Sequence, residues 1–442
     1  MRKLFLKIGG FVFKKIREIL SAKEGEKIML RGWVYRQRTS GSVSFVVLRD
    51  STGIIQCAVK KDKVDQASWD AATTCFIESS VIVEGSVKKD ERAPGGAEIQ
   101  AEKMQFVSKG EPYPISKDLS DEFLLDVRHL WLRSRKMTAI MQARHYLVSY
   151  LREFFAKENF FELAPPIITK AECEGGSTLF EMNYFGEKAF LTQSSQLYAE
   201  VFIFAHEKVY VLAPSFRAEK SRTIRHLAEY WHLEPEMAWY DWKDNMKLQE
   251  EMISYAVQKM VKNHPDLLEQ CGRNPDDLKK IVPPFPRLDY LDAVAKVNEL
   301  GGKMEEGQDF GADEEALLTK EYDVPVFVHH FPSEIKAFYM EDDPDRPGYV
   351  LNDDLLAPQG HGEIIGGSQR IWEYDKLVAK MKKFGLDPDS PDYKWYVDLR
   401  RYGSVPHSGF GLGIERLTKW VLNLNHIRDA IPFPRTINRL YP

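Results

Sequence analysis

The hydrophobic pattern of this chain changes abruptly near residue 125. Before the change, short segments rich in valine and isoleucine, such as KIMLRGWVYRQR and SVIVEGSVKK, are separated by turn-forming residues. About five such strands in so short a stretch are typical of a small closed barrel of the OB type. After the change, MTAIMQARHYLVSYLREFFAKENF carries apolar residues at helical spacing, which predicts a long amphipathic helix. The chain therefore combines at least two domains of different architecture.

These patterns divide the chain into four parts. Residues 1–26 are basic and apolar and are expected to form a short helical extension, although an organellar targeting segment has a similar character. Residues 27–108 form the expected barrel, and residues 109–124 form a polar, proline-containing hinge. Residues 125–442, with a more helical segment at about 242–305, predict an α+β domain with a mainly antiparallel sheet flanked by helices, because the strands and helices come in clumps.

Composition narrows the possible partners and location. No apolar run approaches the roughly 20 residues that a membrane-spanning helix needs, so no membrane association is expected. The four cysteines lie far apart, which predicts free thiols in a cytoplasmic protein and argues against a disulfide scaffold or a zinc site. The formal net charge is -5, so binding of a nucleic acid has to depend on local basic patches.

The first segment with candidate site residues is SFRAEKSRTIRHLAEYWHLEPEM. Arg217 and Glu219 are two residues apart on a predicted strand, so both side chains point to one face. There, an arginine can hold a phosphate with two hydrogen bonds, and a glutamate can accept from an amino group. The basic loop that follows is able to wrap a polyphosphate. Taken alone, the segment is equally typical of a solvated hairpin with surface ion pairs.

The second segment is HGEIIGGSQRI. Glu363 precedes the pair Gly366 and Gly367, which lets the backbone approach a ligand closely, and Arg370 follows. An acidic side chain beside such a turn suits a Mg²⁺ ion that bridges ATP phosphates, and Asp354 just upstream is a second candidate ligand. Taken alone, a bulged strand with an internal ion pair explains the same residues.

The third segment is VPHSGFGLGIERLTKWVL, in which glycines 409, 411 and 413 lead into an amphipathic helix. The spacing resembles a dinucleotide-binding fingerprint but follows no βαβ unit, so we reject that interpretation. Small residues here allow Arg416 to stack on a purine while the helix N-terminus faces negative charge. Taken alone, the segment also fits a tight strand-to-helix turn.

Together, and in this order, the three segments resemble the signature motifs of the class II aminoacyl-tRNA synthetases. FRAE and RHLAEYW are similar to motif 2, GFGLGIERL to motif 3, and the long helix followed by FFELAPPII to motif 1, with Pro166 as its proline. The preceding barrel resembles that of the aspartate, asparagine and lysine subgroup, and the resemblance runs from about residue 27 to IPFPRT near the C-terminus. It implies a ligase with ATP as substrate, Mg²⁺ as cofactor, tRNA as acceptor, and a homodimer formed through motif 1.

The resemblance also implies roles for individual residues. Arg217 is expected to hold the α-phosphate of ATP, while Tyr230 and Arg416 enclose the adenine. Glu363, with Asp354 as the weaker candidate, is expected to bind Mg²⁺. No residue has to act as a nucleophile, because the substrate carboxylate attacks the α-phosphate and catalysis consists of positioning and charge neutralisation. The expected ATP-binding set is Arg217, Glu219, His226, Tyr230, Glu363 and Arg416, of which Arg217, Glu219 and Arg416 are the expected catalytic residues.

The amino-acid substrate follows from comparison within the subgroup. Lysine enzymes need acidic groups and no opposing arginine, so Arg370 argues against lysine. Aspartate enzymes carry a lysine in the pattern QSPQLxK, where this sequence has Ala199, which favours a neutral amide and hence asparagine. By resemblance, Arg370 donates to the amide oxygen, Glu229 accepts from the amide nitrogen, Gln196 holds the α-amino group, and Glu174 lies in a loop that closes over the substrate. IKAFYM and RRYGSVPHSGFGLG also resemble the asparagine-specific members, particularly the bacterial ones.

Residues of the predicted barrel are expected to read the tRNA anticodon. Arg38, Phe45 and Gln56 match positions that contact anticodon bases in this subgroup. Phe45 is expected to stack on the central uridine, and the two polar side chains to bond base edges. The alternative for Phe45 is a place in the barrel core, because it lies in an apolar strand.

Three rival functions share parts of this pattern. The first is an aspartyl-tRNA synthetase that does not discriminate between tRNAs. The second is an ammonia ligase that makes free asparagine, against which the barrel argues because such an enzyme reads no anticodon. The third is an inactive RNA-binding relative, which the intact set of charged residues argues against. The favoured hypothesis requires Arg217, Glu363, Arg370 and Arg416 to meet at one cavity on one sheet.

Overall fold

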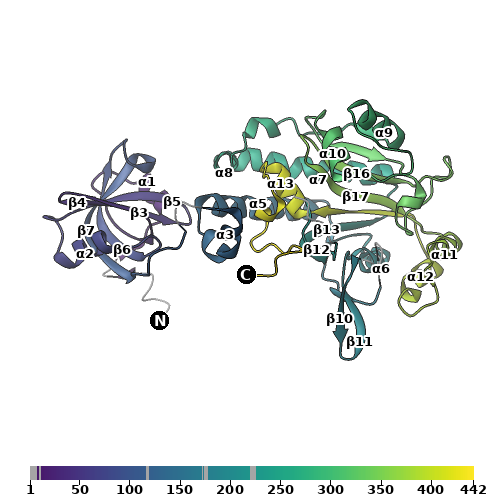
Figure 1. Cartoon of the computed structure of the whole chain (residues 1–442), viewed down its shortest axis with the longest axis horizontal. Coiled ribbons are helices and arrows are strands. Elements are labelled where there is room, and N and C mark those ends of the chain that lie inside the picture. The colour runs from purple at the N-terminus through teal and green to yellow at the C-terminus, as the bar shows by residue number, and fades with distance from the viewer. Residues whose placement is uncertain (1–6, 9–10, 116–118, 172, 174–177, 220–224) are drawn as a thin grey trace. The chain divides into compact units, whose positions relative to one another are not determined.

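The computed structural model of the chain divides into two compact units, Met1–Asp121 and Glu122–Pro442 (Figure 1). Each unit has its own hydrophobic core. The structure describes residues 7–8, 11–115, 119–171, 173, 178–219 and 225–442.

The first unit is built on a closed barrel with the strand order β3-β4-β5-β7-β6. Side chains alternate between its two faces, since Val46 and Leu48 are buried while Phe45 and Val47 are half-exposed. The predicted five-stranded barrel of the OB type is confirmed. Its elements are β3 (Lys27–Ser40), β4 (Val43–Asp50), β5 (Gly53–Lys60), α2 (Gln66–Thr74), β6 (Ser80–Lys89) and β7 (Ala97–Ser108).

The segment ahead of the barrel is helical over only a few residues. The short strands β1 (Lys7–Ile8) and β2 (Phe11–Val12) pair with each other, and the helix α1 (Ile16–Leu20) follows. Ile16 and Ile19 are buried in the barrel core. Within the expected helical extension over residues 1–26, the described residues form one short helix, which packs as part of the barrel. Consecutive glycines in IGGF disfavour a longer helix.

The second unit contains a mixed sheet with the strand order β14-β15-β16-β17-β18-β13-β12-β8. Only the pairs β14–β15 and β12–β8 are parallel among its described strands, so the predicted α+β domain with a mainly antiparallel sheet is confirmed. A smaller sheet joins β9 (Ile168–Thr169), β10 (Phe180–Tyr184) and β11 (Glu187–Leu191), and its hairpin projects from the unit (Figure 1). The strands of the large sheet are β8 (Phe161–Leu163), β12 (Lys208–Phe216), β13 (Glu229–Ala238), β14 (Arg287–Asp289), β15 (Val326–His329), β16 (Asn352–Ala357), β17 (Gly362–Arg370) and β18 (His407–Gly413).

Three helices pack together with the large sheet in one hydrophobic core. Ile140 and Leu147 of α5, Met252 of α7 and Leu417 of α13 are all buried in this core. The predicted long helix is α5, and Ser134 caps it by accepting a hydrogen bond from the backbone nitrogen of Met137. The helices are α3 (Asp121–Asp126), α4 (Arg128–Trp131), α5 (Arg135–Lys157), α6 (Gln196–His206), α7 (Trp242–Asn263), α8 (Pro265–Gln270), α9 (Tyr290–Glu299), α10 (Ala312–Thr319), α11 (Tyr374–Lys383), α12 (Lys394–Arg401) and α13 (Ile414–Val421).

Strand β13 shows why one face of the sheet is available for chemistry. Leu233 and Met237 are buried in the hydrophobic core with the helices. The intervening His232, Glu234 and Glu236 point the other way, because successive side chains of a strand alternate between faces. The helices therefore cover an apolar face, and the opposite face carries polar side chains from the middle of the sheet.

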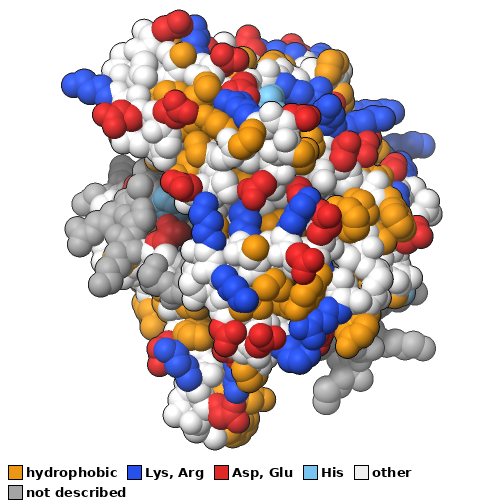
Figure 2. All heavy atoms as spheres, turned by 90° about the vertical axis from the view of Figure 1, so that its right-hand side faces the viewer, with side chains coloured by type: hydrophobic (Ala, Val, Ile, Leu, Met, Phe, Trp, Pro, Cys, Tyr) orange, Lys and Arg blue, Asp and Glu red, His pale blue; other side chains and the backbone are white. Residues whose placement is uncertain are grey.

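On the face that Figure 2 shows, basic and acidic side chains are mixed with hydrophobic ones. Neither sign of charge dominates this face. This agrees with the formal net charge of -5. Among the helices of the described segments, none is both long and apolar enough to cross a lipid bilayer.

Candidate active site

Two neighbouring cavities lie on the polar face of the large sheet. The larger has a volume of about 550 Å³ and the smaller about 60 Å³, and both are lined by Arg217, His232, Glu363 and Gly411. The larger one also contains Gln196, Asp354 and Arg370, and the smaller one His226, Tyr230 and Arg416. Most of the sequence-predicted site residues therefore meet at one place, including the four from distant segments on which the hypothesis depends.

Cationic side chains surround the junction of the two cavities. The Nη1 atom of Arg416 lies 2.9 Å from a carboxylate oxygen of Glu363. Arg217 follows the end of β12, and its guanidinium carbon lies 5.9 Å from the centre of the Tyr230 ring. Burial raises the pKa of Glu363, but Arg416 and other nearby cations outweigh burial and hold that pKa at about 2. The local potential is thus positive enough to keep a carboxylate ionised, and it suits a polyphosphate.

Glu315 of α10 supports this region, although sequence reasoning missed it. Its carboxylate accepts hydrogen bonds from Nη2 of Arg225 at 2.6 Å and from the backbone nitrogen of Glu363 at 2.5 Å. A β-carbon added at Gly362 would lie 2.4 Å from the same carboxylate, which explains the glycine at that position. No local signal marks Glu315, because it lies in a helix far from the motifs in sequence.

Asp354 and Glu363 converge from neighbouring strands at Gly366. A β-carbon built on Gly366 would lie 3.5 Å from Oδ1 of Asp354 and 3.7 Å from Oε1 of Glu363. Burial raises the pKa of Asp354 to about 7 against the opposing effect of Lys336, whose Nζ atom lies 2.8 Å from its Oδ2. The two carboxylates offer the oxygen donors that Mg²⁺ prefers.

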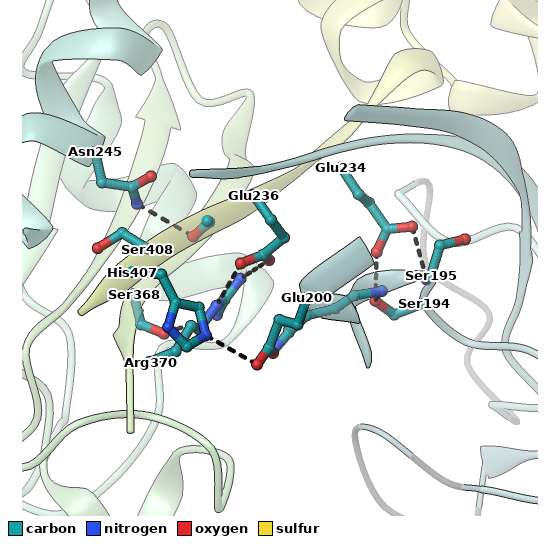
Figure 3. A network of polar contacts seen from close by, with 12 residues as sticks. Ser194, Ser195, Glu200, Glu234, Glu236, Asn245, Ser368, Arg370, His407 and Ser408 are labelled. Atoms are coloured by element: carbon teal, nitrogen blue, oxygen red, sulfur yellow. Dashed lines mark hydrogen bonds and ion pairs between the residues drawn. The ribbon is translucent and has the colours of Figure 1, made fainter. Parts of the chain in front are cut away.

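The far end of the larger cavity holds a buried ion pair between Arg370 and Glu236 (Figure 3). The guanidinium donates from Nη2 and Nε to the two carboxylate oxygens, at 2.6 and 3.3 Å, and from Nη1 to Oγ of Ser368 at 2.8 Å. Burial disfavours the charged guanidinium, but Glu236 outweighs burial and raises the pKa of Arg370. Arg370 is therefore a charged donor whose countercharge is already in place.

Glu234 and Gln196 complete this end of the cavity. Glu234 accepts hydrogen bonds from the hydroxyl of Ser194 and from the backbone nitrogen of Ser195, the latter at 2.8 Å. Gln196 donates from Nε2 to Glu200 at 2.9 Å. Glu234 and Glu236 share one face of β13 with Tyr230. The alternation of side chains between the two faces of a strand could have identified both glutamates from the segment YWHLEPE.

Glu229 is not where the sequence hypothesis put it. It pairs with Phe216 at the start of β13 and lies outside both cavities as their described residues delimit them. It lies five and seven positions before Glu234 and Glu236, and these odd offsets put its side chain on the opposite face of the strand. The carboxylates that β13 contributes to the larger cavity are thus Glu234 and Glu236.

Ala199 also differs from expectation, because it packs in an apolar cluster with Ile203 and Val209 and is absent from the described lining of both cavities. Gln196 of α6 lines the larger cavity, whereas position 199 is turned toward the sheet. Glu219 lies 3.7 Å from both Arg217 and His226 but is likewise absent from that lining.

The expected residue Glu174 falls outside the described residues. Pro166, the proline of the expected motif 1, is exposed in the segment between β8 and β9.

The barrel brings its three predicted side chains to neighbouring strands. Arg38 pairs with Phe45, and its guanidinium lies 4.8 Å from the centre of the Phe45 ring. Gln56 pairs with Val47 on the next strand and donates to Glu98 at 2.9 Å. Phe45 faces outward and is half-exposed, so the alternative of a place in the barrel core is wrong.

Comparison with known proteins places this site in a family. Residues 120–437 match the family described as "tRNA synthetases class II (D, K and N)", and residues 28–107 match the "OB-fold nucleic acid binding domain". The asparagine--tRNA ligase of Thermococcus kodakarensis is 52% identical over 428 residues, which cover 96% of this chain and 98% of the relative. That of Pelotomaculum thermopropionicum is 46% identical over 419 residues, which cover 95% of this chain and 97% of the relative.

A solved structure agrees with these relatives. The crystal structure of asparaginyl-tRNA synthetase from Pyrococcus horikoshii complexed with asparaginyl-adenylate superposes with a TM-score of 0.94 at 50% identity, covering 97% of this chain and 99% of that chain. The family expected from the sequence is confirmed: this chain belongs to the class II tRNA synthetases of the aspartate, lysine and asparagine group.

Proposed function

We propose that this chain activates L-asparagine with ATP and transfers it to the 3′ end of an asparagine-accepting tRNA. The observation that carries the choice of amino acid is the buried pair of Arg370 and Glu236. A guanidinium already balanced by a carboxylate can donate to an amide oxygen, whereas a second carboxylate would meet the charges of Glu234 and Glu236. The relatives named above, which are asparagine--tRNA ligases, support the same choice.

The geometry supports a reaction that proceeds by positioning and charge neutralisation. We place adenine at the smaller cavity, which Tyr230 and Arg416 line, so that the α-phosphate would lie near Arg217 at the junction. The asparagine carboxylate attacks the α-phosphorus, the adenylate forms, and pyrophosphate leaves. A ribose hydroxyl of the tRNA then attacks the carbonyl carbon, and AMP leaves. Arg217 and Arg416 stabilise the charge on the phosphates throughout.

The convergent carboxylates of Asp354 and Glu363 would hold Mg²⁺, whose charge would offset that of the triphosphate. The ammonium of Lys336 beside Asp354 supplies a countercharge from the chain itself. Both acids lie in the larger cavity on the side of the junction, away from Arg370.

Exchange of labelled pyrophosphate into ATP tests the proposed substrate. Asparagine is expected to support exchange, and aspartate to be poorer by at least about 100-fold, because pairing of buried polar groups discriminates by that order. An equal or larger response to aspartate would contradict the assignment to asparagine. ATP cleavage that needs ammonia and aspartate but no tRNA would instead point to the ammonia ligase.

We expect Phe45→Ala to weaken tRNA binding without affecting activation of the amino acid. Loss of one stacked base is expected to raise KM for tRNA by about tenfold or more. Pyrophosphate exchange should stay unchanged, because Phe45 belongs to the barrel rather than to the two cavities. The matched control is Val107→Ala, an exposed apolar residue at the end of β7. Equal effects of the two variants on tRNA would argue against a role for Phe45.

The exposed apolar side chains near Pro166 suit a homodimer. Phe161 of β8 stacks on His206 at the end of α6, with the ring centres 4.5 Å apart, and Phe202 also contacts His206. Exposed apolar side chains on these elements suit burial against a second copy of the chain. The exposed apolar residues are Phe161, Ile167, Ile168, Val201, Phe202 and Phe204.

For the location of the protein we favour the cytoplasm, since the four cysteines form no disulfide within the described chain.

A further inference from the structure

Two consecutive histidines at the end of β15 turn their rings toward each other and toward Asp289. Nδ1 of His329 lies 2.7 Å from Nδ1 of His330, which in turn lies 3.6 Å from Oδ2 of Asp289. Asp289 ends β14 and is the direct partner of His329 in the parallel pair of β14 and β15. One nitrogen or oxygen atom from each of the three side chains lies within 4.8 Å of the other two. We call these three residues the His-His-Asp cluster.

The backbone of His330 explains how two neighbouring side chains come together. Successive side chains of a regular strand point to opposite faces. His330 follows the last residue of β15 and has a φ of 58°, in the left-handed region that residues other than glycine rarely adopt. The chain therefore turns at this residue, and the two ring centres lie only 4.7 Å apart.

The spacing of the three atoms suits a tetrahedral metal ion. Zn²⁺ bonds of about 2.0–2.1 Å at tetrahedral angles put neighbouring ligand atoms about 3.3 Å apart. The span of 3.6 Å between His330 and Asp289 is close to this value, and the two nitrogens have to separate by about 0.6 Å. Two imidazoles and one carboxylate, with water in the fourth position, form a ligand set that Zn²⁺ accepts. Mg²⁺ is disfavoured here, because it prefers oxygen ligands.

Both imidazoles favour the neutral form that binding of a metal requires. Burial is the main cause, since it lowers the pKa of His329 to about 4 and also lowers the pKa of His330. Nε2 of His330 lies 3.5 Å from a carboxylate oxygen of Asp343. A carboxylate in this position favours the tautomer with its proton on Nε2, which leaves the lone pair of Nδ1 for the ion.

Arg346 is the main competitor for the carboxylate of Asp289. Its Nη1 atom lies 2.7 Å from Oδ2 of Asp289. A carboxylate oxygen has two lone pairs, so Oδ2 can accept from Arg346 and still coordinate an ion. The carboxylates of Asp289 and Asp343 together offset the positive charge of Arg346. All three members of the His-His-Asp cluster are half-buried, so an ion can enter from solvent and a water can complete its coordination.

The His-His-Asp cluster lies apart from the candidate active site. Val328 and Phe331 flank the two histidines in sequence and line the larger cavity. His329 and His330 are absent from the described lining of both cavities. Trp242, the first residue of α7, lies beside both histidines, with its ring centre 5.5 Å from that of His329 and 4.6 Å from that of His330. An ion there would act on the fold rather than on the reaction.

We propose that Asp289, His329 and His330 bind one Zn²⁺ ion, which fastens the end of β14 to the end of β15. Asp289 also caps α9 by accepting a hydrogen bond from the backbone nitrogen of Leu291 at 3.1 Å, so the ion would fix the start of that helix as well. The wide spacing of the cysteines does not bear on this site, because its ligands are imidazole and carboxylate. The site is independent of the proposed function.

Calorimetric titration of the full-length protein with ZnCl₂, in the presence of excess MgCl₂, tests the proposed site. Mg²⁺ competes for sites made only of oxygen atoms, such as the one proposed at Asp354 and Glu363. One Zn²⁺ per chain is expected to bind with a Kd of about 10 µM or tighter. His329→Ala and His330→Ala should each weaken binding by about 100-fold or more, and Asp343→Asn, which alters only the second partner of His330, by about tenfold.

His129→Ala, at an exposed histidine of α4, is the matched control and should bind Zn²⁺ as the wild type does. Arg346→Gln is expected to tighten binding by about tenfold, because it removes a cation beside Asp289, and misfolding cannot produce such an increase. Binding that is unchanged in both His329→Ala and His330→Ala, or that falls equally in the control, would refute the proposal.

Measurements without a ligand variant keep the test valid if one of these variants does not fold. Wild-type crystals grown with ZnCl₂ should show an anomalous difference peak at the zinc edge about 2.0–2.2 Å from Nδ1 of both histidines and Oδ2 of Asp289. In solution, paramagnetic Co²⁺ should quench the fluorescence of the wild type more than that of Trp242→Phe, because Trp242 lies beside the site. A peak confined to other positions, or equal quenching in both proteins, would overturn the assignment.

Discussion

Arg217→Ala is expected to lower kcat/KM for asparagine-dependent pyrophosphate exchange by roughly 1,000-fold or more. Arg217 lines both cavities at their junction, where charge shifts on the α-phosphate during attack. Cationic groups that stabilise a transferring phosphoryl group typically contribute factors of this size. The loss should fall mainly on kcat, because the interaction is stronger in the transition state than in the ground state.

Two companion variants sharpen this measurement. Arg217→Lys keeps the charge but loses the two-pronged geometry, so an intermediate loss is expected. Arg401→Ala removes an exposed arginine of α12 outside the described lining of both cavities and should leave exchange unchanged. A loss of less than about tenfold in Arg217→Ala would mean that another group neutralises the α-phosphate.

Gly409→Ala is expected to reduce kcat/KM for asparagine by about 100-fold or more and to lower the melting temperature. A β-carbon on Gly409 would lie 2.1 Å from Oε1 of Glu236, its cross-strand partner, so the carboxylate has to move. Displacement of Glu236 leaves Arg370 buried without its countercharge, which costs about 3–5 kcal/mol. Steady-state exchange kinetics and thermal unfolding by circular dichroism measure the two effects.

A double-mutant cycle identifies the cause of that loss. If Gly409→Ala acts by displacing Glu236, then adding it to Glu236→Ala, which frees the space, should change kcat/KM little further. Fully additive losses would show that the glycine is needed for another reason, such as the backbone of β18 itself.

Local sequence patterns were sufficient for the architecture and for the phosphate end of the site. Alternation in the N-terminal segments predicted the closed barrel, and helical spacing predicted α5. Arg217, Glu363 and Arg416 lie in motifs whose residue types already suit a nucleotide, and they converge in the structure. These inferences succeed because side-chain direction within one strand or helix follows from the residue spacing alone.

Side-chain direction also explains why Glu229 and Ala199 are absent from the described lining of the cavities. Glu229 has a suitable side chain in the right motif, but the alternation of β13 turns Glu234 and Glu236 into the cavity instead. Ala199 lies three positions after the cavity residue Gln196, yet the helical turn directs it to the apolar cluster. The residue spacing along each element separates these positions.

The sequence by itself determined which elements form and which chemical groups they carry, because both depend on residues close together in the chain. Only the tertiary structure decided which distant groups meet: Glu315 with Arg225, Arg370 with Glu236, and Glu200 with His407. Such pairs form between segments that share no local pattern. The order of the strands across the sheet, the packing of α6 and α10 against it, and the packing of α12 against α6 bring them together.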